Sequence, residues 1–219
     1  NCTGGNCERR IAYLKAASEL LLGDLEEMVA NWEADGAARS AVLANNGVAG
    51  ITALLTGMGS LSYGELAGER MKLGLLLRDP EEEHDCFSDN THNSHFYNQQ
   101  GIVNVYTGRY TRTDGAVVEG PSLSGLTQQI APELDRELLA SLDATSDAMT
   151  ALKTRAENIE RYDQMLGEGN PEGEAVVQAA IDGLIAQTRP IERLIAALDL
   201  GAVELEGSDS LDAPSAVFQ

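Results

Sequence analysis

Apolar residues recur at helical spacing in the first part of the chain. Within residues 7–34 they return every three or four positions, at Ile11, Leu14, Ala17, Leu21, Leu25, Met28, Val29 and Trp32. Because residues with this spacing share one face of an α-helix, the pattern predicts an amphipathic helix that Gly36 ends. Residues 40–64 then contain no charged residue but five glycines and two asparagines, which favours a buried helix over a membrane span.

Small residues mark the second half of this uncharged segment. Gly57, Ser60, Gly64 and Gly68 are spaced by three and four, a pattern that lets a neighbouring helix approach closely. We expect the helix to continue to Leu77, with residues 57–59 as the place where it could break. Arg78-Asp79-Pro80 should stop it, because the residue before a proline is pushed out of the α region.

The remainder of the chain predicts further helices joined by turns. We expect a helix over 92–106 capped by Ser88, Asp89 or Asn90, followed by an irregular loop over 107–121 with a small hairpin at 116–118. A short helix capped by Ser122 and a long helix over 133–166 opened by Pro132 should come next. After a turn at 167–173 we expect a helix over 174–200 bent at Pro190 and an acidic tail over 201–219. The predicted fold class is an all-α bundle, with one domain over 1–200 and a helix-poor tail.

The charge of the chain limits its partners. A formal net charge of −20 argues against nucleic acid and anionic membrane surfaces, and favours cations or basic proteins. An acidic surface that serves solubility alone explains the same charge. An aromatic content of 5% indicates that the core is mainly aliphatic.

Three cysteines bear on the compartment. Cys2 and Cys7 bracket Thr-Gly-Gly-Asn, a loop short and flexible enough to close a disulfide, and such a bond implies an oxidising environment. The two could instead bind a metal, but no second cysteine pair follows them. Cys86 is left over. The chain starts at Asn1, so we expect that a signal segment or a longer N-terminal part precedes it.

All three histidines lie in one segment, EEEHDCFSDNTHNSHFYN, residues 81–98. On a helix that starts near Asp89, the residues Asp89, His92 and His95 would follow one another at spacings of three and share a face. A carboxylate and two imidazoles in this arrangement can bind zinc, iron or copper. Spacing alone favours a simpler interpretation, in which the histidines face the core at a polar helix start and residues 81–83 form a solvated run of charge. A serine-hydrolase relay does not fit so short a segment.

Several segments together resemble the imelysin family, in particular its iron-regulated IrpA-like branch. They are LLTGMGSLSYGELAGERM, EEEHDCFSDNTHNSHFYNQQGIVNVYTGRY, YLKAASELLLGDLEEMVANW and LEGSDSL, and the resemblance extends over nearly the whole chain. It implies a two-part helical fold, export to the periplasm or outer membrane, often as a lipoprotein, and a role in iron acquisition.

The resemblance also bears on the site. The family is named as a metallopeptidase around a GxHxxE motif, and this motif is missing here, so the chain resembles the C-terminal portion of a longer member whose N-terminal portion would be its partner. The residues that match the family pattern beside the presumed ligand site are Glu69, Arg70, Ser88, Asp89, Asn90 and His92. Of these, His92 and Asp89 are the candidate ligands for a metal, iron or zinc.

Three functions are therefore compatible with the sequence. The first is an exported binding protein of iron uptake that holds a metal ion or a metal-bearing ligand, without enzymatic activity of its own. The second is a metal-dependent peptidase whose GxHxxE motif lies outside this chain. The third is a structural or interaction module. Metal affinity without turnover separates the first from the other two.

Overall fold

The computed structural model describes residues 3–218, and these form two compact units, residues up to Ile51 and residues from Thr52 onward. The predicted division into a domain over 1–200 and a tail over 201–219 stays a prediction; residues 201–218 belong to the second unit.

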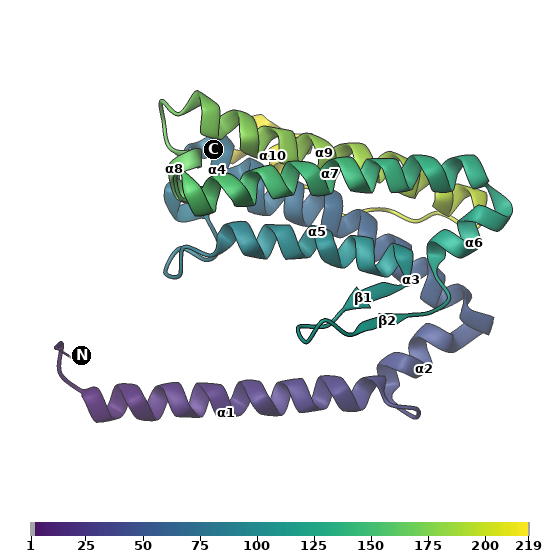
Figure 1. The fold of residues 1–219 in the computed structure, drawn as a ribbon, viewed down its shortest axis with the longest axis horizontal. Helices are drawn as coiled ribbons and strands as arrows, with labels where there is room; N and C mark the ends of the chain where they lie inside the picture. The colour runs from purple at the N-terminus through teal and green to yellow at the C-terminus, as the bar shows by residue number, and fades with distance from the viewer. Residues whose placement is uncertain (1–2, 219) are drawn as a thin grey trace. The chain divides into compact units, whose positions relative to one another are not determined.

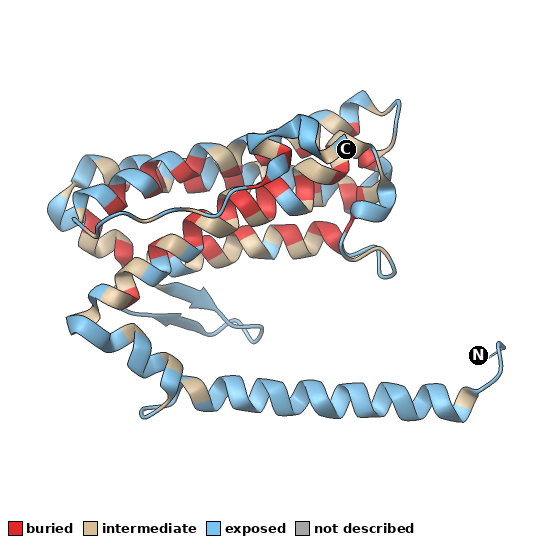
Figure 2. Ribbon diagram, turned by 180° about the vertical axis from the view of Figure 1, so that it is seen from behind, coloured by how far each residue is buried: buried red, intermediate tan, exposed pale blue. Residues whose placement is uncertain are grey.

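The first unit consists of α1 (Cys7–Trp32), α2 (Ala37–Leu43), a 3₁₀ turn, η1 (Ala44–Gly47), and the start of α3 (Val48–Ser60). The predicted first helix is confirmed as α1. None of its 26 residues is buried, as the pale blue ribbon in Figure 2 shows. Its apolar residues are therefore exposed.

Two asparagines break the uncharged segment. Asn45 and Asn46 have φ of 51° and 56°, a left-handed conformation that asparagine tolerates better than most residues. The predicted break at residues 57–59 is therefore wrong, because α3 runs through them. The expectation of one buried helix is also wrong. Residues 40–49 include no buried residue, and the first buried large side chain is that of Leu55.

The helical run from Cys7 to Leu77 contains a window that is long and apolar enough to cross a membrane, judged by length and composition alone. Core helices of water-soluble proteins can have the same composition.

Two cysteines can be located. Cys7 is disulfide-bonded and Cys86 is a free, half-buried cysteine. Cys2, the predicted partner of Cys7, lies outside the described residues, so the Cys2–Cys7 pairing stays a prediction.

The second unit is a helical bundle with one small hairpin, which confirms the all-α class (Figure 1). In chain order it contains the rest of α3, the π-helical η2 (Leu61–Lys72), α4 (Leu73–Leu77), η3 (Pro80–Glu82), α5 (Thr91–Thr107), β1 (Arg109–Thr111), β2 (Val117–Glu119), α6 (Leu123–Ile130), α7 (Pro132–Asn158), α8 (Tyr162–Leu166), α9 (Pro171–Ala197), α10 (Asp209–Asp212) and η4 (Pro214–Phe218). The long helix α9 packs against α7 and η2, and α5 packs against α7.

Local signals set several of these boundaries as predicted. The helix before Pro80 ends at Leu77, and Arg78 takes a left-handed φ of 52°. Ser122 caps α6, because its side-chain oxygen accepts a hydrogen bond of 2.9 Å from the backbone N–H of Gly125. Pro132 opens α7. The predicted helix over 133–166, however, divides at residues 159–161 into α7 and α8.

The core of the bundle is mainly aliphatic, as the composition suggested. Its fully buried members come from η2, α7, α8 and α9: Leu66, Ala67, Met71, Met149, Leu152, Met165, Val177, Ala180, Ile181 and Leu184. Each buried side chain of leucine or methionine size contributes about 1.5–3 kcal/mol relative to exposure. This burial holds the four elements together.

A buried pair of amides crosses the same bundle. Gln99 of α5 and Gln187 of α9 exchange two hydrogen bonds of 3.0 and 2.9 Å. Gln187 also donates to the hydroxyl of Ser62 in η2, and Gln99 to the carbonyl oxygen of Leu142 in α7. Since unpaired buried polar groups cost about 1–3 kcal/mol each, this network fixes the relative register of four helices.

The C-terminal segment lies against the glycines of η2. A methyl group on Gly64 would lie 2.5 Å from the carbonyl oxygen of Glu206, and one on Gly68 would lie 2.3 Å from Cβ of Ser208. The hydroxyl of Ser210 donates to the carbonyl oxygen of Gly68 over 2.9 Å. The small residues thus permit a close approach, as predicted, but by the extended chain 205–208 rather than by a helix.

This contact predicts opposite effects for two glycine substitutions. Gly64→Ala should lower the free energy of unfolding by about 1–3 kcal/mol, because the new methyl group meets backbone that cannot move aside easily. Gly57→Ala should raise it by about 0.5–1 kcal/mol, because alanine favours the helix and no described atom lies within 4 Å of the new methyl group. Urea unfolding of both variants tests the pair. An equal effect of the two substitutions would contradict the docked C-terminal segment.

Candidate functional site

The histidine-rich segment begins in a loop that folds back on itself. Pro80 opens η3, and the side chain of Asp79 accepts a hydrogen bond of 2.9 Å from the backbone N–H of Glu81. The backbone N–H of Asp85 donates to the hydroxyl of Thr91, the first residue of α5. These contacts place residues 83–89 beside the start of α5.

Three carboxyl groups converge at this loop. Glu83 and Asp89 from the loop and Asp163 from α8 each offer an oxygen, and these oxygens lie within 4.8 Å of one another. Glu83 is only 5% exposed, and oxygen Oδ1 of Asp163 is buried without a hydrogen-bond partner among the described residues. Burial raises the pKa of Glu83, and the neighbouring charges of Asp163, Asp89 and Asp85 raise it further, whereas a hydrogen bond with Thr91 opposes the shift. We call Glu83, Asp89 and Asp163 the carboxylate triad.

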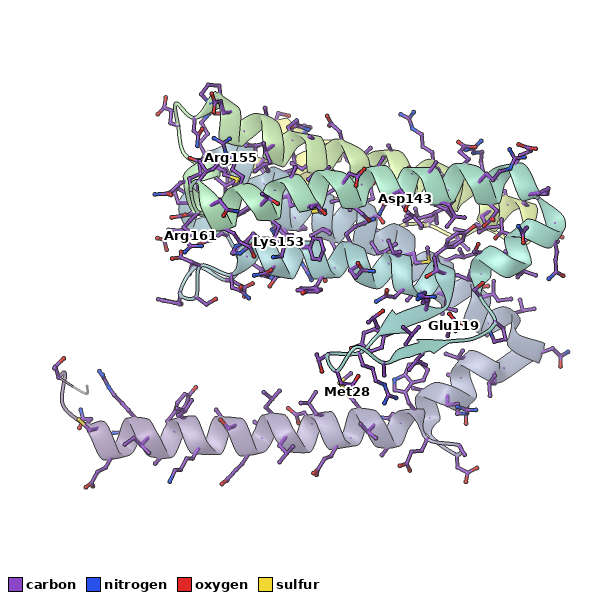
Figure 3. All side chains as sticks on the ribbon, viewed as in Figure 1. Met28, Glu119, Asp143, Lys153, Arg155 and Arg161 are labelled. Carbon is purple, nitrogen blue, oxygen red and sulfur yellow. The ribbon has the colours of Figure 1, made fainter. Side chains whose placement is uncertain are left out.

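The corner between α7 and α8 presents Asp163 to the triad. Arg155, near the end of α7, donates to Glu160 over 2.6 Å, and Arg161 at the start of α8 donates to the carbonyl oxygen of Ala156 over 3.2 Å (Figure 3). The backbone N–H of Arg161 donates to the side chain of Gln164 over 2.9 Å. These bonds hold the short turn that separates the two helices.

Asp89 does not belong to a helix. Its φ of 51° is left-handed, and α5 begins two residues later with Asn90 as its N-cap. Asp89 and His92 therefore do not share a helical face, which was the basis for predicting them as a ligand pair. The geometry brings Asp89 together with Glu83 and Asp163 instead, and no histidine nitrogen of residues 3–218 joins this group.

His92 is nearly buried at the start of α5. Its Nε2 atom lies 3.1 Å from the side-chain nitrogen of Asn93 and accepts a hydrogen bond from it, while Nδ1 has no partner among residues 3–218. Burial lowers the pKa of His92. A shallow cavity of about 530 Å³ lies between the start of α5 and α7, and it is lined by Asn90, Asn93, Ser94, Tyr97, Lys153 and Glu157. Binding of a metal by His92 stays a prediction.

His95 is a core residue. It is fully buried, and its ring meets the rings of His84 and Tyr162 edge to face, with centroids 5.6 and 5.1 Å away. Neither ring nitrogen has a hydrogen-bond partner within the described part of the chain. Burial, with the nearby charges of His84 and Arg70, lowers the pKa of His95 to about 3. The interpretation of His92 and His95 as buried, core-facing residues agrees with this structure.

Tyr162 closes the same buried space. Tyr162 is only 1% exposed, and its hydroxyl group has no hydrogen-bond partner among residues 3–218. Burial raises its pKa, and the charge of Glu83 raises it further. The described buried side-chain atoms without a hydrogen-bond partner thus come from this segment and from α8: Nδ1 of His92, both nitrogens of His95, the hydroxyl of Tyr162 and Oδ1 of Asp163.

The other predicted site residues are dispersed. Ser88 is exposed and donates to the carbonyl oxygen of Asp85 over 3.2 Å, and Asn90 accepts from the side chain of Asn93 over 2.9 Å. Arg70 pairs with Glu65 over 2.6 Å. Glu69 accepts a hydrogen bond of 2.5 Å from Ser208, so it contacts the C-terminal segment. Of the six, Asp89 alone belongs to the triad.

Two members of the triad were not predicted. Glu83 was assigned to a solvated run of charge, and Glu81 and Glu82 are indeed exposed, but Glu83 is buried. Asp163 was assigned to the inside of a continuous helix. No spacing rule connects it with Glu83, because the two are brought together only by the division between α7 and α8.

The family comparison agrees with the helical fold. The family model for imelysin, peptidase M75, matches residues 4–191. The chain belongs to the imelysin family. A search among curated proteins found no match. The imelysin chain contains no GxHxxE sequence, since none of its three histidines has a glycine two residues before it.

The burial of His95 predicts a pH dependence of stability. Its folded pKa of about 3 lies below the unfolded value of 6.5, so its neutral form stabilises the fold fully above pH 6.5, and this contribution is lost as the pH falls toward 3. From pH 7 to 5 the loss should be about 2 kcal/mol. His95→Phe keeps a ring for Tyr162 and removes the titration.

Urea unfolding at pH 7 and pH 5 checks this expectation. The unmodified protein should lose about 2 kcal/mol more stability between the two pH values than the His95→Phe variant does. Comparing each protein with itself cancels any packing cost of the larger ring. Equal losses would show that His95 is not buried in its neutral form.

Proposed function

We propose that this imelysin is an exported, IrpA-like protein of iron acquisition that binds an iron ion through the carboxylate triad. The single observation that supports this most is the convergence of three carboxylate oxygens within 4.8 Å, one of them from a buried glutamate. Like charges held this close in a partly buried place repel one another, and a bound cation would remove the repulsion.

The donor set favours a hard cation. Carboxylate oxygens suit ions that prefer oxygen ligands, whereas structural zinc is mostly held by cysteine and histidine. We therefore favour iron over zinc, the other predicted metal. Three protein ligands would leave coordination positions for water or for oxygen atoms of a metal-bearing ligand.

The state of Glu83 couples binding to pH. Because burial raises the pKa of Glu83, protons compete with a cation for this carboxylate more strongly as the pH falls. Affinity should thus decline as the pH falls. This coupling would also favour release of the ion under acidic conditions.

Export and partners belong to the same proposal. The disulfide at Cys7 supports an oxidising location, such as the periplasm or the outer membrane. Two of the segments that resemble the IrpA-like branch contact each other, since Ser208 and Ser210 of LEGSDSL bond to Glu69 and Gly68 of GELAGERM. The N-terminal portion of a longer family chain, and a lipoprotein attachment through it, stay predictions. Peptidase activity, the alternative, would require a GxHxxE motif that this sequence lacks.

Substitution of Asp163 tests the proposed site. Asp163→Asn keeps the size of the side chain but removes one charged ligand, so it should weaken binding of Mn²⁺ and of Fe²⁺ under anaerobic conditions at least 10-fold. Asp143→Asn is the matched control. Asp143 is an exposed aspartate on α7 (Figure 3), outside the triad.

Isothermal titration calorimetry of the three proteins gives the answer, with Zn²⁺ titrated for comparison. We expect the unmodified protein and Asp143→Asn to bind one Mn²⁺ or Fe²⁺ with the same affinity. If Asp163→Asn also binds with that affinity, or if the unmodified protein binds neither ion, the proposed function is wrong.

A further inference from the structure

The exposed helix α1 has a seven-residue repeat. Seven positions along one face of α1 follow one another at alternating spacings of three and four, and all but Ser18 are apolar: Ile11, Leu14, Ser18, Leu21, Leu25, Met28 and Trp32. This is the a/d pattern of a coiled coil, whose seam follows a repeat of 3.5 residues and faces one partner helix. Six of the seven are large apolar side chains, each at least 49% exposed.

We propose that α1 pairs with α1 of a second copy of this chain as an antiparallel coiled coil. This interaction surface is independent of the carboxylate triad and of its metal. The charges along α1 and the self-complementarity of its apolar seam favour this pairing.

The charges of α1 are distributed against the helix dipole. Residues 8–19 carry three cations and two anions, whereas residues 20–32 carry three anions and no cation. Arg9 and Arg10 thus lie at the positive end of the helix dipole, and Glu26 and Glu27 near its negative end, where each is unfavourable by a few tenths of a kcal/mol or more. Within a single helix this arrangement has no benefit.

An antiparallel pair reverses that disadvantage. It places the basic end of each helix beside the acidic end of the other, and it also opposes the two helix dipoles. A parallel pair would instead bring the three anions in the second half of each copy together. The charge pattern therefore selects a second copy in the antiparallel orientation.

The seam is also complementary to itself in this orientation. With the two-fold axis between Glu19 and Leu20, Ile11 of one copy lies opposite Met28 of the other, and Leu14 opposite Leu25. The a and d positions from Ile11 to Met28 then face one another, as in an antiparallel coiled coil. The two-fold symmetry makes the interface isologous, so the same surface serves both copies and the assembly closes as a dimer.

Ser18 is compatible with burial at the centre of this seam. Its hydroxyl group donates a hydrogen bond of 2.8 Å to the carbonyl oxygen of Leu14 within the same helix. Its donor is thus already satisfied, and the small side chain would lie opposite Leu21 of the other copy.

Sedimentation equilibrium of the whole chain and of two adjacent leucine variants tests the dimer. Leu21→Glu places a charge in the seam of both copies and should raise the dimer dissociation constant at least roughly 100-fold, since the change occurs twice. Leu20→Glu is the control, because Leu20 is equally apolar and 67% exposed but lies outside the seam. Its dissociation constant should stay within a few-fold of the original.

Thiol crosslinking in a Cys86→Ser background tests the orientation. A mixture of Leu14→Cys and Leu25→Cys chains should form mixed disulfides, whereas neither variant alone should crosslink efficiently. Efficient self-crosslinking of each variant would indicate a parallel pair and overturn the proposal. A monomeric chain at all concentrations, or equal dissociation constants for Leu21→Glu and Leu20→Glu, would overturn it as well.

Discussion

The carboxyl group of Glu83 is buried next to two further carboxyl groups, and the surrounding structure has to hold it there. Two like charges about 4 Å apart near a protein surface repel by roughly 4 kcal/mol, and burial makes the charged form of Glu83 less favourable still. The repulsion is relieved either by a proton on Glu83, consistent with its raised pKa, or by a cation shared among the three. The loop after Pro80, the left-handed Asp89 and the corner before α8 all contribute to this convergence.

Much of the fold could be predicted because its signals are local. Proline fixes its own backbone and restricts the residue before it, so the ends of helices at Pro80 and Pro132 are visible in the sequence. The all-α class follows from the helical spacing of apolar residues. The break at Asn45 was not visible, because asparagine is also compatible with a helix and only its left-handed conformation reveals the turn. The division between α7 and α8 lacks a glycine or proline signal altogether.

The site was less predictable because its contacts are distant in sequence. The histidine-rich segment was identified correctly as unusual, but the spacing argument assumed that Asp89 lies on the helix of His92. Glu83 resembles its exposed neighbours in every local respect, and it is buried only by the folded structure around it. In the same way, the spacing of the glycines in η2 predicted a close contact, but it did not indicate that the chain near Ser208 makes this contact.

The central claim is that the carboxylate triad is a cation site, and crystallography with Mn²⁺ tests it most directly. Crystals of the unmodified protein soaked in Mn²⁺ should show one anomalous-scattering peak between Glu83, Asp89 and Asp163, within about 2.5 Å of an oxygen of each. Anomalous peaks only at other carboxylates, with the triad unoccupied in a well-ordered loop, would contradict the account.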